Sequence, residues 1–556
     1  MSMIRTLAGG AFVLVLLAAA PASAQSGTPT LSYGESATED DAPVSTRRER
    51  RRPSAEVHPY VEANAGVSAD LSGGDDEVLT YTSVAAGVDA RVATRRVTVQ
   101  ASYRYERRFE IEGDLPDNEV HSGVAGVHAA VAPGVSLDAA ALATRTGGAG
   151  EPTALSQQVP TAQLYSVVGG PTVNAHAGPV AIGAAYRIGY VRVEQGDELA
   201  GAPLADGYEA VGHNATASIG MAPGRAPIGW TVGAGYTRSD ESGDFENRFE
   251  AAYVRGDVVL PVGPTLALTA GVGYERTDAS QIDVLRNSAG VPILVDGRPV
   301  PDPTGRRVDA LDRSGIFYDG GFIWRPTPRT ELQARAGHRH GGITVVGSLT
   351  HRFRRGYGLS ASVYDSVGTF GTSVMGDLAR LPREFGVNRN PQTGAIEGCV
   401  FGTDPGTGIC FDQALQGLSN RTFRSRGGTL AFSGGRGPWS FGLGGGYAHR
   451  RYYELESGNF DSLTPQSDES YYFNARIDRR SGRFSGLGLN VTVGSHSGAG
   501  IDASGGLSTG VGTSYYWSLI HGLQIRAALG LTYTNGLLLD EDALIASALL
   551  GLRYTF

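Results

Sequence analysis

The feature that most constrains this chain is a long series of segments in which apolar and polar residues alternate. The stretch Val97–Glu106, VTVQASYRYE, is one example. Successive side chains of a β-strand point to opposite faces, so each segment is predicted to be a strand with one apolar face. About 22 such segments follow one another from Val57 to the C-terminus, and many reach the roughly 10 residues that a membrane-crossing strand needs.

The connections between these segments alternate between short and long. Short turns include Ala132–Gly134, Gly178–Pro179 and Pro261–Pro264. The long connections are polar and lie near Ser72–Glu77, Gly147–Ala162, Glu194–Glu209, Asp278–Asp312, Gly371–Asn420 and Glu454–Glu469. Outer-membrane barrels have short periplasmic turns and longer extracellular loops in strict alternation. The pattern therefore favours an even strand number with both chain ends in the periplasm. One outer connection, at His338–Gly342, is expected to be short.

A closed sheet follows from the membrane argument. After the N-terminal region no segment has about 18 or more consecutive apolar residues, so no transmembrane helix is expected. In hydrocarbon every backbone polar group must be paired, and a sheet achieves this only by closing on itself. The predicted fold is a single all-β, antiparallel, up-and-down transmembrane barrel of about 22 strands. A soluble sandwich also alternates, but its strands are typically about 5–6 residues long.

The N-terminus predicts export. Arg5 precedes an apolar run that ends in the small-residue site Ala22-Ser23-Ala24, so residues 1–24 are predicted to be a signal peptide. Residues 25–56 are predicted to be a disordered periplasmic tail, and residues 57–556 the barrel. The tail ends in an arginine-rich run. A solvated tail is the favoured interpretation, and a contact with peptidoglycan or anionic lipid is the alternative.

A barrel of this size needs something to narrow it. An aqueous channel already exists at 16–18 strands, and at about 22 strands the lumen is wide enough to need a plug. Only about 30 residues separate the predicted cleavage site from the first strand, so a receptor with its own N-terminal plug domain is disfavoured. The constriction is expected to come from an inward-folded loop, and Gly371–Asn420 is the best candidate.

Cys399 and Cys410 are the only cysteines and lie in that candidate loop. In an exported protein an isolated pair so close in sequence predicts a disulfide. The loop-closure model gives such a bond roughly 2–3 kcal/mol. Metal binding through two cysteines alone is a weak alternative.

Four arginines are candidate lumen residues: Arg335, Arg339, Arg352 and Arg476. If they face inward, they could select for anions or anionic polymers. The alternative, which is slightly favoured, is that they fill the lumen while paired with Asp and Glu.

Few residues suggest other chemistry. His338 and His340 are two apart and are expected to share a strand face, but no third ligand is near in sequence. No catalytic residue, metal ligand or cofactor site is predicted, and the chain is not expected to be an enzyme. The net charge of -9 argues weakly against nucleic acid as a partner. The acidic long loops suggest either solvated loops or divalent cations that bridge to lipopolysaccharide.

The last strand resembles the closing strand of Gram-negative outer-membrane barrels. Leu550, Leu552, Tyr554 and Phe556 lie on its apolar face, and the chain ends on the aromatic Phe556. The resemblance implies an outer-membrane location and a C-terminal signal that the barrel-assembly machinery reads. Outer-membrane lipid, lipopolysaccharide and periplasmic chaperones are the other expected partners.

The stretch Arg325–Gly427 resembles the large outer-membrane barrels of sphingomonad-type alphaproteobacteria. The carrying pieces are Arg325-Pro326 with Pro328-Arg329, Ala336 to Gly342, Val363 to Val367 with Phe370-Gly371, Gly398 to Gly402, and Phe423 to Gly427. The resemblance implies fold and location, not a solute. The leading functional prediction is a porin-like channel or structural surface barrel. The alternatives are a conduit for exopolysaccharide or another polymer, and a loop-based surface receptor or adhesin.

Overall fold

The computed structural model describes residues 54–556, apart from residues 73–77, 114–118, 148–160, 196–207, 225, 244, 296–297, 354–355, 388, 391, 397–398, 405, 412–420, 454–466, 500–504 and 536–541. The predicted signal peptide, residues 1–24, and nearly all of the predicted tail lie outside the described residues. The first strand begins at Ser54, three residues before the boundary expected at Val57.

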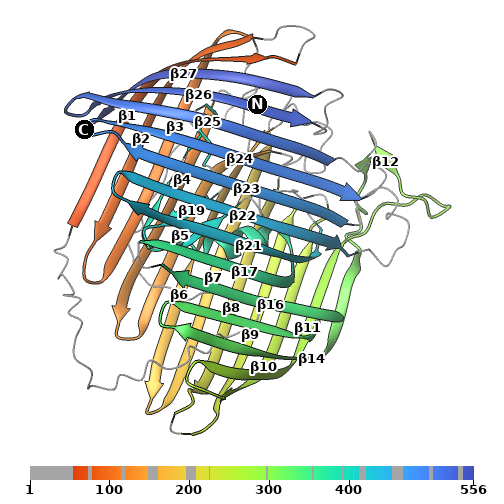
Figure 1. Ribbon diagram of the computed structural model, residues 1–556. Coiled ribbons are helices and arrows are strands. Elements are labelled where there is room, and N and C mark those ends of the chain that lie inside the picture. Colours follow the sequence, from red (N-terminus) through yellow and green to blue (C-terminus); the bar gives the residue numbers. More distant parts are fainter. Residues whose placement is uncertain are drawn as a thin grey trace, which may run out of the picture.

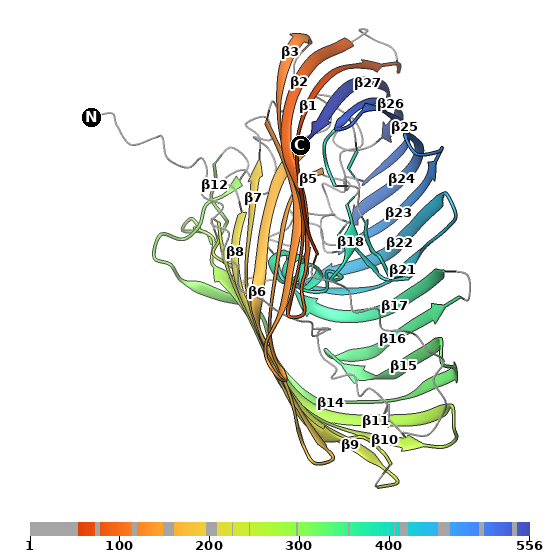
Figure 2. The ribbon, with the colours of Figure 1, turned by 90° about the vertical axis from the view of Figure 1, so that its left-hand side faces the viewer.

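Twenty-two long strands form one sheet that closes on itself (Figures 1 and 2). They are β1 (Ser54–Asp70), β2 (Val78–Ala93), β3 (Val97–Glu112), β4 (Glu119–Ala132), β5 (Val135–Gly147), β6 (Thr161–Ala177), β7 (Val180–Gln195), β8 (Tyr208–Met221), β9 (Gly229–Ser242), β10 (Arg248–Pro261), β11 (Leu266–Ile282), β14 (Arg307–Thr327), β15 (Thr330–Arg339), β16 (Gly342–Arg352), β17 (Tyr357–Gly368), β21 (Phe423–Arg436), β22 (Trp439–Tyr452), β23 (Ser467–Arg480), β24 (Ser485–Ala499), β25 (Gly505–Ile520), β26 (Leu523–Asn535) and β27 (Ala543–Thr555).

Within the described residues, five short strands and one helix are not part of the barrel sheet. They are the hairpin β12 (Leu294–Val295) and β13 (Arg298–Pro299), the helix α1 (Phe370–Leu378), and the small sheet of β18 (Phe385–Gly386), β19 (Cys399–Gly402) and β20 (Gly408–Cys410). The hairpin projects from the end of the barrel opposite the chain's C-terminus (Figure 1). The helix and the small sheet belong to the connection between β17 and β21.

The first and last strands complete the barrel. β1 pairs antiparallel with β27 from Tyr60 opposite Thr555 to Asp70 opposite Ile545. Every other barrel strand pairs antiparallel with its neighbours in chain order. The predicted antiparallel barrel of about 22 strands is therefore confirmed, and the closure pairs the backbone groups that an open sheet edge would expose.

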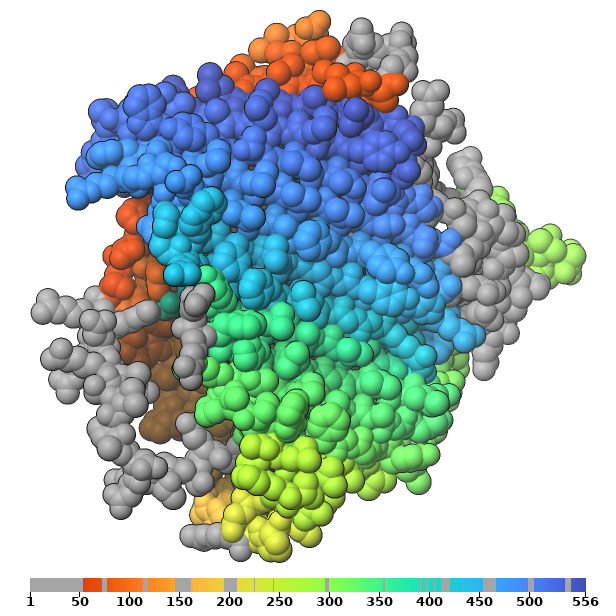
Figure 3. Space-filling model, in the orientation of Figure 1, coloured from red at the N-terminus to blue at the C-terminus, as the bar shows by residue number. Residues whose placement is uncertain are grey.

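The two faces of the wall differ as the alternation predicts. On β1 the outward Val61 and Val67 are exposed, whereas the intervening Glu62 and Asn64 are buried inside the barrel. On β27 the outward residues Leu550, Leu552 and Tyr554 are likewise exposed, as is Phe556 directly after the strand. Side chains pack closely over this outer surface (Figure 3). Among the described residues, no helix is long and apolar enough to cross a membrane.

The connections keep the expected parity. At one end of the barrel the turns are short, as at Pro133–Gly134 and Gly437–Pro438. At the other end most connections are longer, and residues 369–422 form the longest. The outer connection between β15 and β16 consists of His340 and Gly341 alone, so its expected shortness is also confirmed. A closed barrel with an apolar outer belt places the protein in the outer membrane of a Gram-negative bacterium.

A charge on the lipid-facing side of β25 should destabilise the barrel more than a charge on its lumen-facing side. We expect Val511→Arg, which faces lipid near the middle of β25, to lower the free energy of unfolding by about 2–4 kcal/mol. Ser514→Arg is the matched control, because Ser514 lies on the lumen face of the same strand. Urea unfolding in lipid vesicles measures both. Equal losses would contradict the assignment of the two faces.

Candidate channel and the segment that narrows it

The connection between β17 and β21, residues 369–422, is called here the plug segment, and its described residues fold into the barrel. Figure 2 shows its elements between the wall of β1 to β5 and the wall of β21 to β26. Its described residues contact strands on both sides of the lumen, for example β3 through Gln100 and β22 through Gly444. The expectation that the loop Gly371–Asn420 folds inward is therefore confirmed for its described residues, and residues 412–420 lie outside them.

The helix α1 anchors the plug segment through apolar packing. Thr369 caps its N-terminus, since the Thr369 hydroxyl accepts a hydrogen bond from the Thr372 backbone N–H. The helix buries Phe370, Val374 and Leu378. These side chains join a cluster on the inner wall of β4 to β8, which includes Val124, Leu142, Leu164, Val191, Val193, Tyr208 and Ala210. Each buried side chain of this size contributes about 1.5–3 kcal/mol, so the cluster is the main attachment of α1 to the wall.

One aromatic pair sets the position of α1. The rings of Phe370 and Tyr208 meet edge to face, with centroids 5.4 Å apart. The Gly371 backbone N–H donates to the Tyr208 hydroxyl over 2.9 Å. The start of the helix is therefore fixed against β8 by both apolar and polar contacts.

Glycines on the wall leave room for the plug segment. A Cβ at Gly189 or Gly212, on β7 and β8, would overlap the side chain of Met375. A Cβ at Gly442 would overlap the ring of Phe401, and one at Gly444 would overlap the sulfurs of the disulfide. The lumen face of β22 thus carries glycine where the plug segment lies closest to it.

Polar contacts hold the middle of the plug segment against β3 and β4. The Phe385 backbone N–H donates to Gln100 Oε1 over 3.0 Å. Arg389 donates to the hydroxyls of Ser102, over 2.9 Å, and Ser122, over 2.7 Å. Burial lowers the pKa of the Arg389 guanidinium, and the nearby Tyr60 and Asp89 oppose that shift.

A turn of the plug segment covers a buried arginine of β3. The Arg108 guanidinium is fully buried and donates to the carbonyls of Thr393, over 2.8 Å, and Gln392, over 3.1 Å. Gly394 follows with a φ of 75°, a left-handed conformation that favours glycine. A side chain there would also approach Glu106 and Arg104.

Cys399 and Cys410 form a disulfide within the plug segment. They are directly opposite each other on β19 and β20. The bond lies against Gly444 of β22, and Asn474 Nδ2 of β23 is 3.9 Å from Cys399 Sγ. The bond thus closes the hairpin at the point where it meets the wall.

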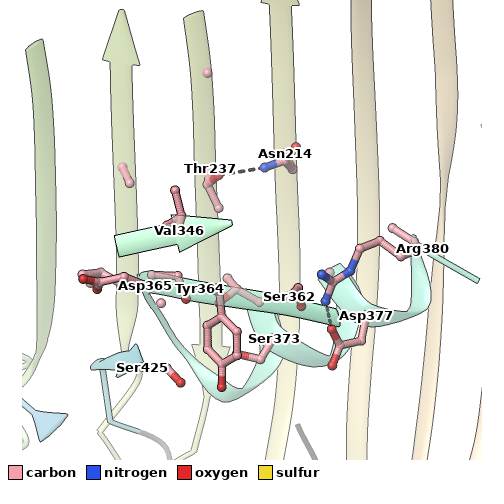
Figure 4. Close-up of a pocket in the computed structure, with 18 of the residues that line it drawn as sticks. Asn214, Thr237, Val346, Ser362, Tyr364, Asp365, Ser373, Asp377, Arg380 and Ser425 are labelled. Carbon is pink, nitrogen blue, oxygen red and sulfur yellow. Dashed lines mark hydrogen bonds and ion pairs between the residues drawn. The ribbon is translucent and has the colours of Figure 1, made fainter. Parts of the chain in front are cut away.

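A cavity of ≈ 540 Å³ remains between the plug segment and the wall. Its lining comes mainly from β8 to β11, β14 to β17, β21 and α1. Figure 4 shows Asn214 and Thr237 on one side, with Ser373, Asp377 and Arg380 of the plug segment on another. Burial raises the pKa of Asp377, and the ion pair with Arg380 acts in the opposite direction.

Two arginines and two aspartates form a closed network on the cavity wall. Arg255 of β10 contacts Asp257, at 2.7 Å, and Asp319 of β14, at 2.8 Å. Arg335 of β15 contacts the same two carboxylates, at 2.5 and 3.1 Å. Arg339 forms a separate pair with Glu275 at 2.6 Å.

All four arginines named from the sequence lie on the lumen face. Arg335 and Arg339 line the cavity in the pairs just described. Arg352 is exposed at the periplasmic end of β16, on the face that carries Thr344. Arg476 pairs with Asp478 at 2.8 Å and lies away from the cavity. The paired state of three of them fits the lumen-filling interpretation better than an anion-selective one. The sequence analysis did not identify the partners Asp257, Asp319 and Glu275, although each lies on the inward face of a strand with alternating apolar and polar residues.

His338 and His340 do not share a strand face, so that expectation is wrong. β15 ends at Arg339, and His340 lies in the turn with a φ of 52°. His338 stacks on Tyr318 outside the barrel, whereas His340 Nδ1 lies 3.3 Å from Glu275 on the inside. The tight turn reverses the alternation between the two residues.

In the wall beside the cavity, the neighbouring strands β16 and β17 are only partly paired, and their junction is called here the seam. β16 and β17 pair only from Gly347 opposite Val363 to Arg352 opposite Gly358. The five outer residues of β16 therefore have no partner on β17. The cavity reaches both edges of this seam, at Thr344 and at Asp365.

Arginines from β21 bridge the seam. Arg424 donates to the His340 carbonyl over 3.1 Å, and Arg426 donates to the Ile343 carbonyl over 3.0 Å. Asp365 of β17 pairs with both guanidinium groups, at 2.7 and 3.3 Å. The side chains thus pair the His340 carbonyl in the turn and the Ile343 carbonyl in the part of β16 that does not pair with β17.

Comparisons with known proteins find a likeness of fold. No protein-family description matches the chain, and no curated protein does either. Among solved structures, the FrpB iron transporter from Neisseria meningitidis is similar at 11% identity and a TM-score of 0.46, over 90% of this chain and 82% of that one.

Two further structures are similar at the same level. The ferric-catecholate import receptor Fiu from E. coli has 11% identity and a TM-score of 0.42, over 89% of this chain and 81% of that one. The siderophore receptor PiuA from Acinetobacter baumannii has 8% identity and a TM-score of 0.43, over 90% and 82%. The functional assignment therefore depends on the residues of this barrel.

The fit at Gly444 can be tested directly. We expect Gly444→Val to lift the disulfide hairpin from β22, because the added side chain occupies the place of the sulfurs. Hydrogen exchange of the amides in residues 399–410 should become faster. Gly445→Val, on the outward face of the same strand, is the control and should leave that exchange unchanged. Unchanged exchange in Gly444→Val would refute the close fit.

The buried carboxyl of Asp377 gives a test with a defined sign. The pKa of Asp377 is raised when the plug segment is packed against the wall. The stability of this packed state is therefore greatest below the ordinary pKa of 3.8, where the carboxyl is protonated, and falls as the pH rises through the raised pKa. At neutral pH, Asp377→Asn should therefore slow hydrogen exchange in α1. The difference from the unmodified chain should shrink in acid, and faster exchange at neutral pH would contradict this expectation.

Proposed function

We propose that the chain is an outer-membrane channel for small hydrophilic solutes, in which the plug segment narrows the lumen to one path along β8 to β17. The observation that carries the proposal is the cavity of ≈ 540 Å³ between the plug segment and that part of the wall. Its size falls within the about 300–1,000 Å³ of typical ligand pockets. A porin-like role fits better than a purely structural one, since a cavity lined in part by hydroxyl groups and paired charges lies inside the barrel.

A polymer conduit has less support. The plug segment reaches from β3 and β4 across to β22, and Gln392 also lies beside Gly530 of β26. A polymer with a wide cross-section would need this segment to leave the lumen. The apolar cluster around α1 opposes that movement.

The surface-receptor alternative places function in the outer loops, many of which lie outside the described residues. The projecting β12–β13 hairpin is the described part that favours it (Figure 1).

No catalytic step is part of the proposal. The relation to large alphaproteobacterial barrels stays a prediction.

We also propose that the barrel-assembly machinery, with periplasmic chaperones, recognises the closing strand. Leu550, Leu552, Tyr554 and Phe556 face outward together, and the Phe556 backbone N–H donates to Pro59 across the closure. Their outward position keeps them accessible while the barrel is still open.

Single-channel recording in planar bilayers tests the channel proposal. We expect a small conductance from the mature chain and a much larger one when residues 371–420 are replaced by a short Gly-Ser linker, because the segment occupies the lumen. Removal of residues 287–300, which contain the β12–β13 hairpin, is the control and should leave the conductance unchanged. No conductance from either protein would overturn the channel and favour a surface role.

A further inference from the structure

The charges that line the cavity are all compensated. Seven arginines and four carboxylates line it, and each of them forms a salt bridge within the described part of the chain. Arg187, for example, pairs with Asp138, and Arg450 pairs with Asp468. Channels that select ions instead present rings of charge to the pore.

Hydroxyl groups also line the cavity, beside apolar side chains such as Ala252, Val346 and Leu430. Ser348, Thr350 and Ser360 come from the adjacent strands β16 and β17. Ser425 comes from β21, which pairs with β17, and Ser373 comes from the plug segment (Figure 4). A hydroxyl both donates and accepts hydrogen bonds, so such a surface matches a solute that does the same.

We propose that the path through the cavity prefers uncharged polyhydroxylated solutes of sugar size over charged solutes of equal size. This inference depends on the proposed channel function. A charged solute loses water on entering a narrow space and gains no unpaired counter-charge there. A sugar exchanges its hydrogen bonds with water for hydrogen bonds with the serine and threonine hydroxyls.

Vesicle swelling separates the two kinds of solute. Purified chain is reconstituted into phosphatidylethanolamine and phosphatidylglycerol vesicles and exposed to glucose, gluconate or protonated glucosamine, which are matched in size. We expect glucose to enter several-fold faster than either ion. Equal or faster entry of gluconate or glucosamine would overturn the preference while leaving the channel in place. No entry of any solute, together with no conductance, would instead overturn the channel itself.

Two substitutions with opposite charge effects test whether these residues set the preference. Arg335→Gln leaves Asp257 and Asp319 with one guanidinium, so the reversal potential in a KCl gradient should shift toward cation selectivity. Glu275→Gln leaves Arg339 without its carboxylate and should shift the potential toward anion selectivity.

Arg479→Gln is the matched control, because Arg479 lies over the Trp439 ring on the outer face and should leave the potential unchanged. Failure of both lumen variants to move the potential would show that solutes do not pass these residues. Heat-modifiable gel mobility checks that each variant has formed a closed barrel.

Discussion

The requirement to pair every backbone N–H and C=O inside lipid determines most of this structure. A strand has no internal hydrogen bonds, so each one needs two neighbours, and the first strand must meet the last. β1 and β27 meet this requirement over eleven residue pairs, from Tyr60 to Asp70 on β1. The same requirement explains the seam between β16 and β17. Where the ladder stops, Arg424 supplies a donor to the His340 carbonyl of the neighbouring turn, and Arg426 supplies one to the Ile343 carbonyl of β16.

Closure with 22 strands creates a second problem, because the enclosed space is too wide for side chains from the wall alone to fill. The chain fills it with the plug segment, which uses two kinds of contact. On β4 to β8 the inner wall is apolar, so α1 attaches as in a protein core. On β22 the inner wall is glycine, so Phe401 and the disulfide approach the backbone closely. The two attachments lie on opposite sides and leave the remaining space along β8 to β17.

Much of the fold follows from local patterns in the sequence. Period-2 alternation and the parity of connection lengths predict the strand number, the closure and the short β15–β16 connection, because each depends on neighbours in the chain. The site depends on distant neighbours. That Arg255 and Arg335 share Asp257 and Asp319 requires the register of β10, β11, β14 and β15, which alternation alone does not supply. The error at His340 has a local cause, since both residues of the turn, His340 and Gly341, are left-handed and the turn reverses the face on which the His340 side chain lies.

The charge pairing on the inner wall links stability to selectivity. Many charged side chains on the inner wall are buried, and an unpaired charge there would carry a large desolvation cost. Glu62 is an example of a buried charge that is paired. Its carboxylate contacts Arg104, Arg526 and Arg553 at 2.9, 3.0 and 3.5 Å. A cavity lining whose charges are paired in this way offers no unpaired charge to a passing solute. Preference for uncharged solutes then arises from the same pairing that lets a narrowed barrel bury its arginines.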